Sequence, residues 1–161
     1  MLNAPAGLTV DFTLVEPSAM LGAWSWLLPH EATPILVTAL GNVFLQVAGG
    51  RVAWLDVGAA ELSVVAESLA EFQALLQTAD RIEEWFVPDL VAALRAREPL
   101  GQGQCYSFKI PPTLGGQLEP ANFHVLNVAT HLAGMGKIQV QVIDLPLGTE
   151  IRAVKLEEDD A

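Results

Sequence analysis

The sequence predicts a single soluble domain of the α+β class, and three observations support this prediction. Hydrophobic residues make up 52% of the chain and charged residues only 17%, a composition typical of a folded protein. Residues 34–56 alternate like strands joined by glycine-containing turns. Residues 68–98 and 128–142 repeat their apolar side chains at helical spacing. We assign residues 1–156 to this domain and residues 157–161 to an acidic tail.

The N-terminal part of the chain predicts one strand and one short helix. Leu8–Leu14 alternates apolar and polar residues, which is the period of a half-buried strand. Ser18 is placed to cap a helix that runs through Leu27. Two tryptophans two residues apart cannot face the same side of a helix, so we expect Trp24 or Trp26 to be partly exposed.

A meander of strands follows. Residues 34–40, 43–47 and 51–56 are rich in β-branched and aromatic side chains, and turns at 41–42 and 48–50 separate them. We expect a short additional strand at 61–65.

The segment from 68 to 98 predicts helices. Ser68 and Glu71 have the spacing of a capping box, in which each of the two side chains accepts a hydrogen bond from the backbone N–H of the other residue. We expect Asp80 to cap a second helix, and Pro88 to kink that helix or start a new turn. The apolar stripe continues to about Arg97.

The stretch from Gly101 to Gly116 is the most distinctive part of the chain. Its centre, 104–110, predicts a strand that the two prolines at 111 and 112 end, because proline lacks a backbone donor. We expect Cys105–Ile110 in the middle of the sheet, and a further strand at 122–126.

From Val128 onward the apolar period becomes helical. Gly134 and Gly136 weaken this helix by about 1 kcal/mol each, and such glycines often allow another element to pack closely. Ile151–Leu156 predicts a last strand.

Candidate catalytic and metal-binding residues are few. The three histidines, His30, His124 and His131, have no metal-ligand spacing, and His131 fits a core or rim position. Cys105 with a distant histidine is the minimum for a thiol nucleophile, but a small buried side chain in a strand is the more common role. We therefore expect no enzyme activity, no cofactor and no metal.

Charge restricts the possible partners. The chain has 19 acidic and 8 basic residues, a net charge of −11. Such a domain repels nucleic acid and anionic membranes, and its complementary macromolecule is basic, although acidity that serves only solubility is an equal alternative. Residues 56–98 hold nine acids and three bases, which indicate either a solvated helix face or a docking surface. The single cysteine, the lack of a signal-like N-terminus and the short apolar runs predict a cytoplasmic protein.

The central stretch resembles the fingerprint of a bacterial immunity family, formerly a domain of unknown function, that protects against DNase effectors of type VI secretion. The resembling segments occur in one order over about residues 20–151: Gly41–Leu45, Val52–Asp56, Ser68 with Glu71 and Phe72, Gly103–Pro112 with Leu114–Gly116, and Asp144–Ile151. The resemblance implies a central, mostly antiparallel sheet with helices packed around it, similar in arrangement to SUKH immunity folds. Two features depart from the family: the N-terminal region is shorter, and Lys137-Ile138-Gln139 stands where members tend to have Gln-Ile-His.

The resemblance implies an immunity-type binding protein that neutralises a cognate basic toxin, a nuclease, by direct occlusion. The partner-binding residues predicted on this basis are Asp80, Glu83, Glu84 and Asp89. The alternatives are a small-molecule-binding or regulatory module of the same fold, and an enzyme that uses Cys105 or a histidine.

Overall fold

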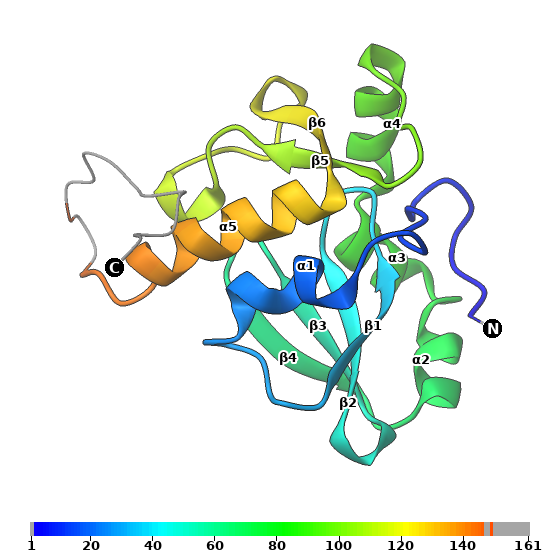
Figure 1. Ribbon diagram of the computed structural model, residues 1–161. Coiled ribbons are helices and arrows are strands. Elements are labelled where there is room, and N and C mark those ends of the chain that lie inside the picture. Colours follow the sequence, from blue (N-terminus) through cyan, green and yellow to red (C-terminus); the bar gives the residue numbers. More distant parts are fainter. Residues whose placement is uncertain (1, 147–148, 150–161) are drawn as a thin grey trace.

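The computed structural model describes residues 2–146 and 149, and its centre is a four-stranded antiparallel sheet (Figure 1). Helices lie on both faces of this sheet, which confirms the predicted α+β class. The strands follow one another in the order β1-β2-β3-β4, with these bounds: β1 Ala32–Val37, β2 Val43–Val47, β3 Val52–Asp56 and β4 Glu61–Ala66.

The predicted meander is confirmed, and β4 extends it by one strand. The β2–β3 connection is a tight turn at Ala48–Gly50, in which Gly49 and Gly50 have φ angles of 79° and 76°. Glycine adopts such angles without steric cost, so the two glycines allow the strands to reverse.

The predicted strand at Leu8–Leu14 is wrong. A single bridge joins Thr9 to Thr38, and the Val10 N–H donates to the Val37 carbonyl at 3.0 Å. Pairing ends there because the Asp11 carboxylate accepts the Thr13 backbone N–H at 2.9 Å. This local bond turns the chain away from β1.

The first helix, α1 (Pro17–Leu21), begins one residue before the predicted cap at Ser18. Its N-cap is Glu16, which makes no side-chain capping bond, and Pro17 supplies a first helical residue that needs no hydrogen-bond acceptor. A 3₁₀ turn at Gly22–Trp24 follows. Trp24 is fully buried and Trp26 is only partly buried, as predicted.

The capping box at the start of α2 (Leu69–Leu75) is confirmed in its first half. The Ser68 hydroxyl oxygen accepts the Glu71 N–H at 3.1 Å, while the Glu71 carboxylate accepts the N–H of Glu67, at 3.3 Å, in place of that of Ser68.

The expectation that Asp80 caps the next helix is wrong. Helix α3 (Ala79–Phe86) has Thr78 at its N-cap, and Asp80 lies in the first turn. Pro88 does start a new helix, α4 (Pro88–Arg97). Val87 joins the two helices with a left-handed φ of 46°, which is uncommon for a β-branched residue.

The expected place of Cys105–Ile110 in the middle of the sheet is wrong. Among residues 2–146, strand β5 (Gln104–Phe108) pairs only with β6 (Phe123–Asn127), in a separate two-stranded sheet. The strand ends before Ile110 because the Asn122 side chain accepts the Ile110 N–H at 2.9 Å and donates to its carbonyl at 2.8 Å. On its other side, β5 donates one backbone bond, from Tyr106 to Ala39 at 2.8 Å.

The last helix, α5 (Val128–Val142), confirms the predicted helix and packs with α1 on one face of the four-stranded sheet. A Cβ at Gly136 would lie 2.6 Å from the Ala23 carbonyl oxygen, so this glycine allows the close approach that the sequence predicted. The predicted strand at Ile151–Leu156 and the tail at 157–161 lie outside the described residues.

Candidate functional site

The predicted partner-binding residues lie on the outer side of α3 and at the start of α4, and all four are exposed. Asp80, Glu83 and Glu84 are spaced i, i+3 and i+4, so they share one face of α3. Asp89 lies in the first turn of α4. We call these four residues the acidic face.

Aromatic packing fixes α3 beneath the acidic face. Trp85 and Phe86 are almost fully buried against the outer face of the four-stranded sheet. The Trp85 ring lies 5.0 Å from that of Phe44 and 5.8 Å from that of Phe72, measured between ring centroids. Such pairs contribute about 0.5–1.5 kcal/mol each beyond the area they bury, so the helix is held firmly.

Helix α4 is anchored on a different cluster. Leu90, Val91 and Leu94 are buried, and they pack with Tyr106 and Phe123 of the small sheet. The acidic face therefore bridges the two sheets, and its backbone is fixed from both sides.

One basic residue interrupts the acidic face. The Arg81 guanidinium lies 2.8 Å from the Glu84 carboxylate and 5.4 Å from the centre of the Trp85 ring. Both charged side chains of the pair are close to half exposed, so the pair adds little to stability. Arg81 is one of the three bases in residues 56–98, and its i, i+3 spacing from Glu84 and i, i+4 spacing from Trp85 are the sequence signals that indicate both contacts.

Two of the four acids also have a structural role. Asp80 and Asp89 stand in the first turns of α3 and α4, where a negative charge is favourable beside the free N–H groups. Glu83 and Glu84 lie in the last turn of the eight-residue helix α3, where a negative charge gains nothing from the free N–H groups of the first turn. The partner-binding hypothesis is therefore tested most cleanly at Glu83 and Glu84.

The distinctive stretch around β5 contributes buried polar contacts that join elements. His131 is fully buried, and its Nε2 lies 3.0 Å from the Gly41 carbonyl oxygen while its Nδ1 lies 2.7 Å from the Ser107 hydroxyl. Because the carbonyl only accepts, Nε2 carries the proton and Nδ1 accepts from Ser107. Burial lowers the pKa of His131 to about 4, so the imidazole is neutral at pH 7. The prediction of a core histidine is confirmed.

Cys105 does not have the surroundings of a nucleophile. It is fully buried in the core, and burial raises the pKa of its thiol to about 12. A thiol that stays protonated and inaccessible is a poor nucleophile, in accordance with the predicted packing role.

Gln139 is a second buried polar side chain that joins elements. Its amide donates to the carbonyls of Val57 and Gly58, at 2.9 and 3.1 Å, and its oxygen accepts from Thr113 at 2.8 Å. These bonds hold the last turns of α5 against the β3–β4 connection.

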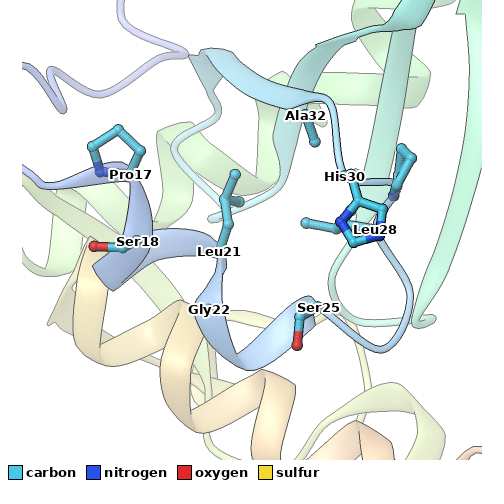
Figure 2. Close-up of a pocket in the computed structure, with 9 residues that line it drawn as sticks. Pro17, Ser18, Leu21, Gly22, Ser25, Leu28, His30 and Ala32 are labelled. Carbon is cyan, nitrogen blue, oxygen red and sulfur yellow. The ribbon is translucent and has the colours of Figure 1, made fainter.

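A hollow of about 400 Å³ lies beside α1 and is lined partly by Ser18, Ser25 and His30 (Figure 2). Ser18 and His30 stand on opposite sides of this hollow, with the apolar Leu21 and Leu28 between them. His30 is exposed, and none of the described residues that line the hollow is a carboxylate that could orient its ring. The alternative of a pocket lined by tryptophan and phenylalanine is not met at this hollow.

Residues 2–146 and 149 contain neither a metal-binding cluster nor a membrane-spanning helix. Within this part of the chain, no three His, Cys, Asp or Glu side chains group together so that they could hold a metal ion. No helix among the same residues is long and apolar enough to cross a bilayer.

Comparison with known proteins bears on the part of the chain that carries the acidic face. Residues 66–139 match the family model described as T6SS immunity protein Tdi1, C-terminal. This match confirms the resemblance to a type VI secretion immunity family, while the likeness to SUKH folds stays a prediction. The matched segment includes all four residues of the acidic face.

A solved protein structure is also similar to this chain. It is the crystal structure of Atu4351 from Agrobacterium tumefaciens. The two structures superpose with a TM-score of 0.48 and share 15% sequence identity, and the match covers 74% of this chain and 60% of that chain. The chain thus spans less than two thirds of that protein's length. No curated protein matches the chain.

Proposed function

Because residues 66–139 match a type VI secretion immunity domain, we propose that this chain neutralises a cognate nuclease toxin by binding it directly, without catalysis. In this proposal, the chain covers the basic surface with which the toxin binds its nucleic-acid substrate. We place this action in the cytoplasm, where the nucleic acid that such a toxin attacks is found.

The observation that carries the proposal is the acidic face in its structural setting. Its four exposed carboxylates lie on α3 and α4, and the buried side of each helix packs into a different hydrophobic cluster. A rigid array of negative charge does not need to be ordered on binding, so less entropy is lost than with flexible acidic side chains on a loop. The net charge of −11 adds long-range attraction to a basic surface.

The proposed mechanism is occlusion. A nuclease holds the phosphate backbone with lysine and arginine side chains, and carboxylates at comparable spacing compete for the same cations. When the acidic face covers these cations, nucleic acid cannot enter, and no bond has to be made or broken.

Charge reversal at the centre of the acidic face tests the proposal. We expect the double variant Glu83→Lys, Glu84→Lys to lose at least roughly tenfold in affinity for the toxin encoded beside this gene, because close charge pairs at such interfaces contribute 1.5 kcal/mol or more. The measurements are a pull-down after co-expression and a DNase assay with increasing amounts of each variant.

A matched control separates this face from the net charge of the protein. Glu31 and Glu119 are also exposed, and they lie outside α3 and α4. The double variant Glu31→Lys, Glu119→Lys changes the net charge by the same amount, and it should protect nearly as well as the wild type. Equal loss of protection by both double variants would show that overall charge, rather than this face, determines binding.

A further inference from the structure

The outer edge of β4 is a strand edge with no neighbour in the described residues. β4 is the last strand of the four-stranded sheet (Figure 1). Glu61, Ser63 and Val64 on this strand are exposed. In an antiparallel pair, alternate residues direct their N–H and C=O groups away from the partner strand. The β4 edge therefore presents backbone donors and acceptors that another strand can pair with.

The opposite edge of the same sheet, at β1, is protected from pairing with another strand. Pro34 lies within β1, where the register with β2 also shifts, and proline offers no N–H to an incoming strand. The backbone of residues 8–10 covers the end of β1 through its bonds to Val37 and Ala39. β4 contains neither proline nor lysine, and its one register shift against β3 lies at its far end, between Val64 and Ala66, so residues 61–64 form a regular free edge.

The two faces of β4 differ in chemistry. Leu62 and Val64 lie opposite Leu55 and Ala53, on the face that α5 covers, and the Val64 side chain is 46% exposed. Glu61 and Ser63 alternate with them and therefore point to the other face. A strand added to this edge meets apolar side chains on one face and a carboxylate and a hydroxyl on the other.

A pair of like charges at the end of β4 identifies the charge that the partner should carry. Asp56 and Glu61 are directly opposite each other in the β3–β4 register. Burial, and to a smaller extent the charge of Glu61, raise the pKa of Asp56. Like charges in this position destabilise a sheet, and a cation placed beside Glu61 relieves the repulsion.

We propose that the outer edge of β4 is a docking site for an extended strand of the toxin, in which apolar and basic residues alternate. This inference rests on the proposed function for the identity of the partner. Backbone bonds along β4 hold the added strand, its apolar side chains cover Leu62 and Val64, and its basic side chains reach Glu61.

A synthetic strand tests the edge without any need for the toxin. The probe is a fluorescein-labelled peptide, Lys-Val-Lys-Val-Thr-Val-Lys-Val, and the reference peptide has glutamate in place of each lysine. We expect the lysine peptide to bind the full-length chain and to slow amide hydrogen exchange in residues 61–66, and the glutamate peptide not to bind. Glu61→Lys and Val64→Lys should each weaken binding roughly tenfold, since each places a cation beside a basic strand.

The matched control is Thr33→Lys, which adds the same charge to an exposed residue of β1 on the protected edge. This variant should bind the lysine peptide like the wild type. A thermal melt checks folding, and if Val64→Lys fails to fold, the exposed Glu61→Lys variant decides. Absence of binding, or equal binding of both peptides, overturns the proposal.

Other occupants of the edge are recognisable in the same experiments. A wild-type dimer that Glu61→Lys and Val64→Lys convert to monomers would assign the edge to a second copy and overturn the proposal. Peptide binding seen only after removal of residues 150–161 would assign the edge to the chain's own end, with the same consequence.

The toxin then separates this inference from the proposed function. If the toxin binds and the β4 variants bind it as well as the wild type does, the inference is overturned and the proposed function stands. If the lysine peptide binds as expected but the toxin does not, the proposed function fails, and with it the assignment of the strand to the toxin.

Discussion

His131 shows at the residue scale why the distinctive central stretch is structural. The imidazole joins three parts of the fold, since it lies on α5 and bonds to β5 and to the turn between β1 and β2. Gly41 leaves the room for it, because a Cβ there would lie 2.1 Å from Nε2. The Gly-Asn turn and the histidine are therefore one packing unit, although they stand 90 residues apart.

This unit predicts a specific dependence of stability on pH. Burial holds the pKa of His131 at about 4 in the folded state, against 6.5 for a free side chain. Between these two pH values, the His131 side chain is protonated in the unfolded chain but stays neutral in the folded protein. The free energy of unfolding therefore falls as the pH drops from 6.5 to 4, and this histidine causes no change above pH 6.5. The loss is roughly 3 kcal/mol over the whole window.

Urea unfolding at several pH values measures this effect. His131→Gln should be less stable than the wild type at pH 7 but should lose much of the slope below pH 6.5. His124→Gln, a change at an exposed histidine, should keep the slope. A slope that survives in His131→Gln would show that other groups cause the acid sensitivity.

At the element scale, α5 combines two glycines with different surroundings. Gly136 packs against Ala23, whereas a Cβ at Gly134 would meet none of the described residues within 4 Å. The sequence indicated that a helical glycine often allows close packing, but the helical period alone did not show which of the two does so.

Alanine substitution at the two glycines should therefore give opposite results. Gly134→Ala should stabilise the protein by about 1 kcal/mol, because alanine favours the helix and no atom obstructs it. Gly136→Ala should destabilise it by about 1–3 kcal/mol, because the added methyl group forces α5 away from the Ala23 backbone. Thermal or urea unfolding of both variants checks this, and equal effects would contradict the packing described here.

The elements that the sequence predicted well are those whose own side chains determine them. The alternation in residues 43–47 and 52–56 and the capping box at Ser68 needed no distant partner to be recognised. The errors have longer-range or competing causes. The Asp11 carboxylate diverts the chain after Val10, and the Asn122 side chain, 12 residues along the chain from Ile110, ends β5 early.

At the scale of the whole molecule, charge is the property that the sequence determines most directly. The count of acids in residues 56–98 predicted a solvated helix face or a docking surface, and Asp80, Glu83, Glu84 and Asp89 are all exposed. The open edge of β4 depends on strand order and register, which composition and periodicity do not reveal. The ion pair of Arg81 with Glu84, in contrast, follows from their i, i+3 spacing once the helix is recognised.

The association rate of the chain with its toxin, measured by stopped-flow fluorescence over a range of salt concentrations, tests the central claim most directly. We predict that the wild-type rate falls steeply between about 0.05 and 0.5 M salt, as expected when long-range attraction steers two charged surfaces together. The Glu83→Lys, Glu84→Lys variant should associate more slowly at low salt and depend less on salt. A rate that is independent of salt, or identical salt dependence in this variant and the wild type, would contradict the claim that the acidic face receives the toxin.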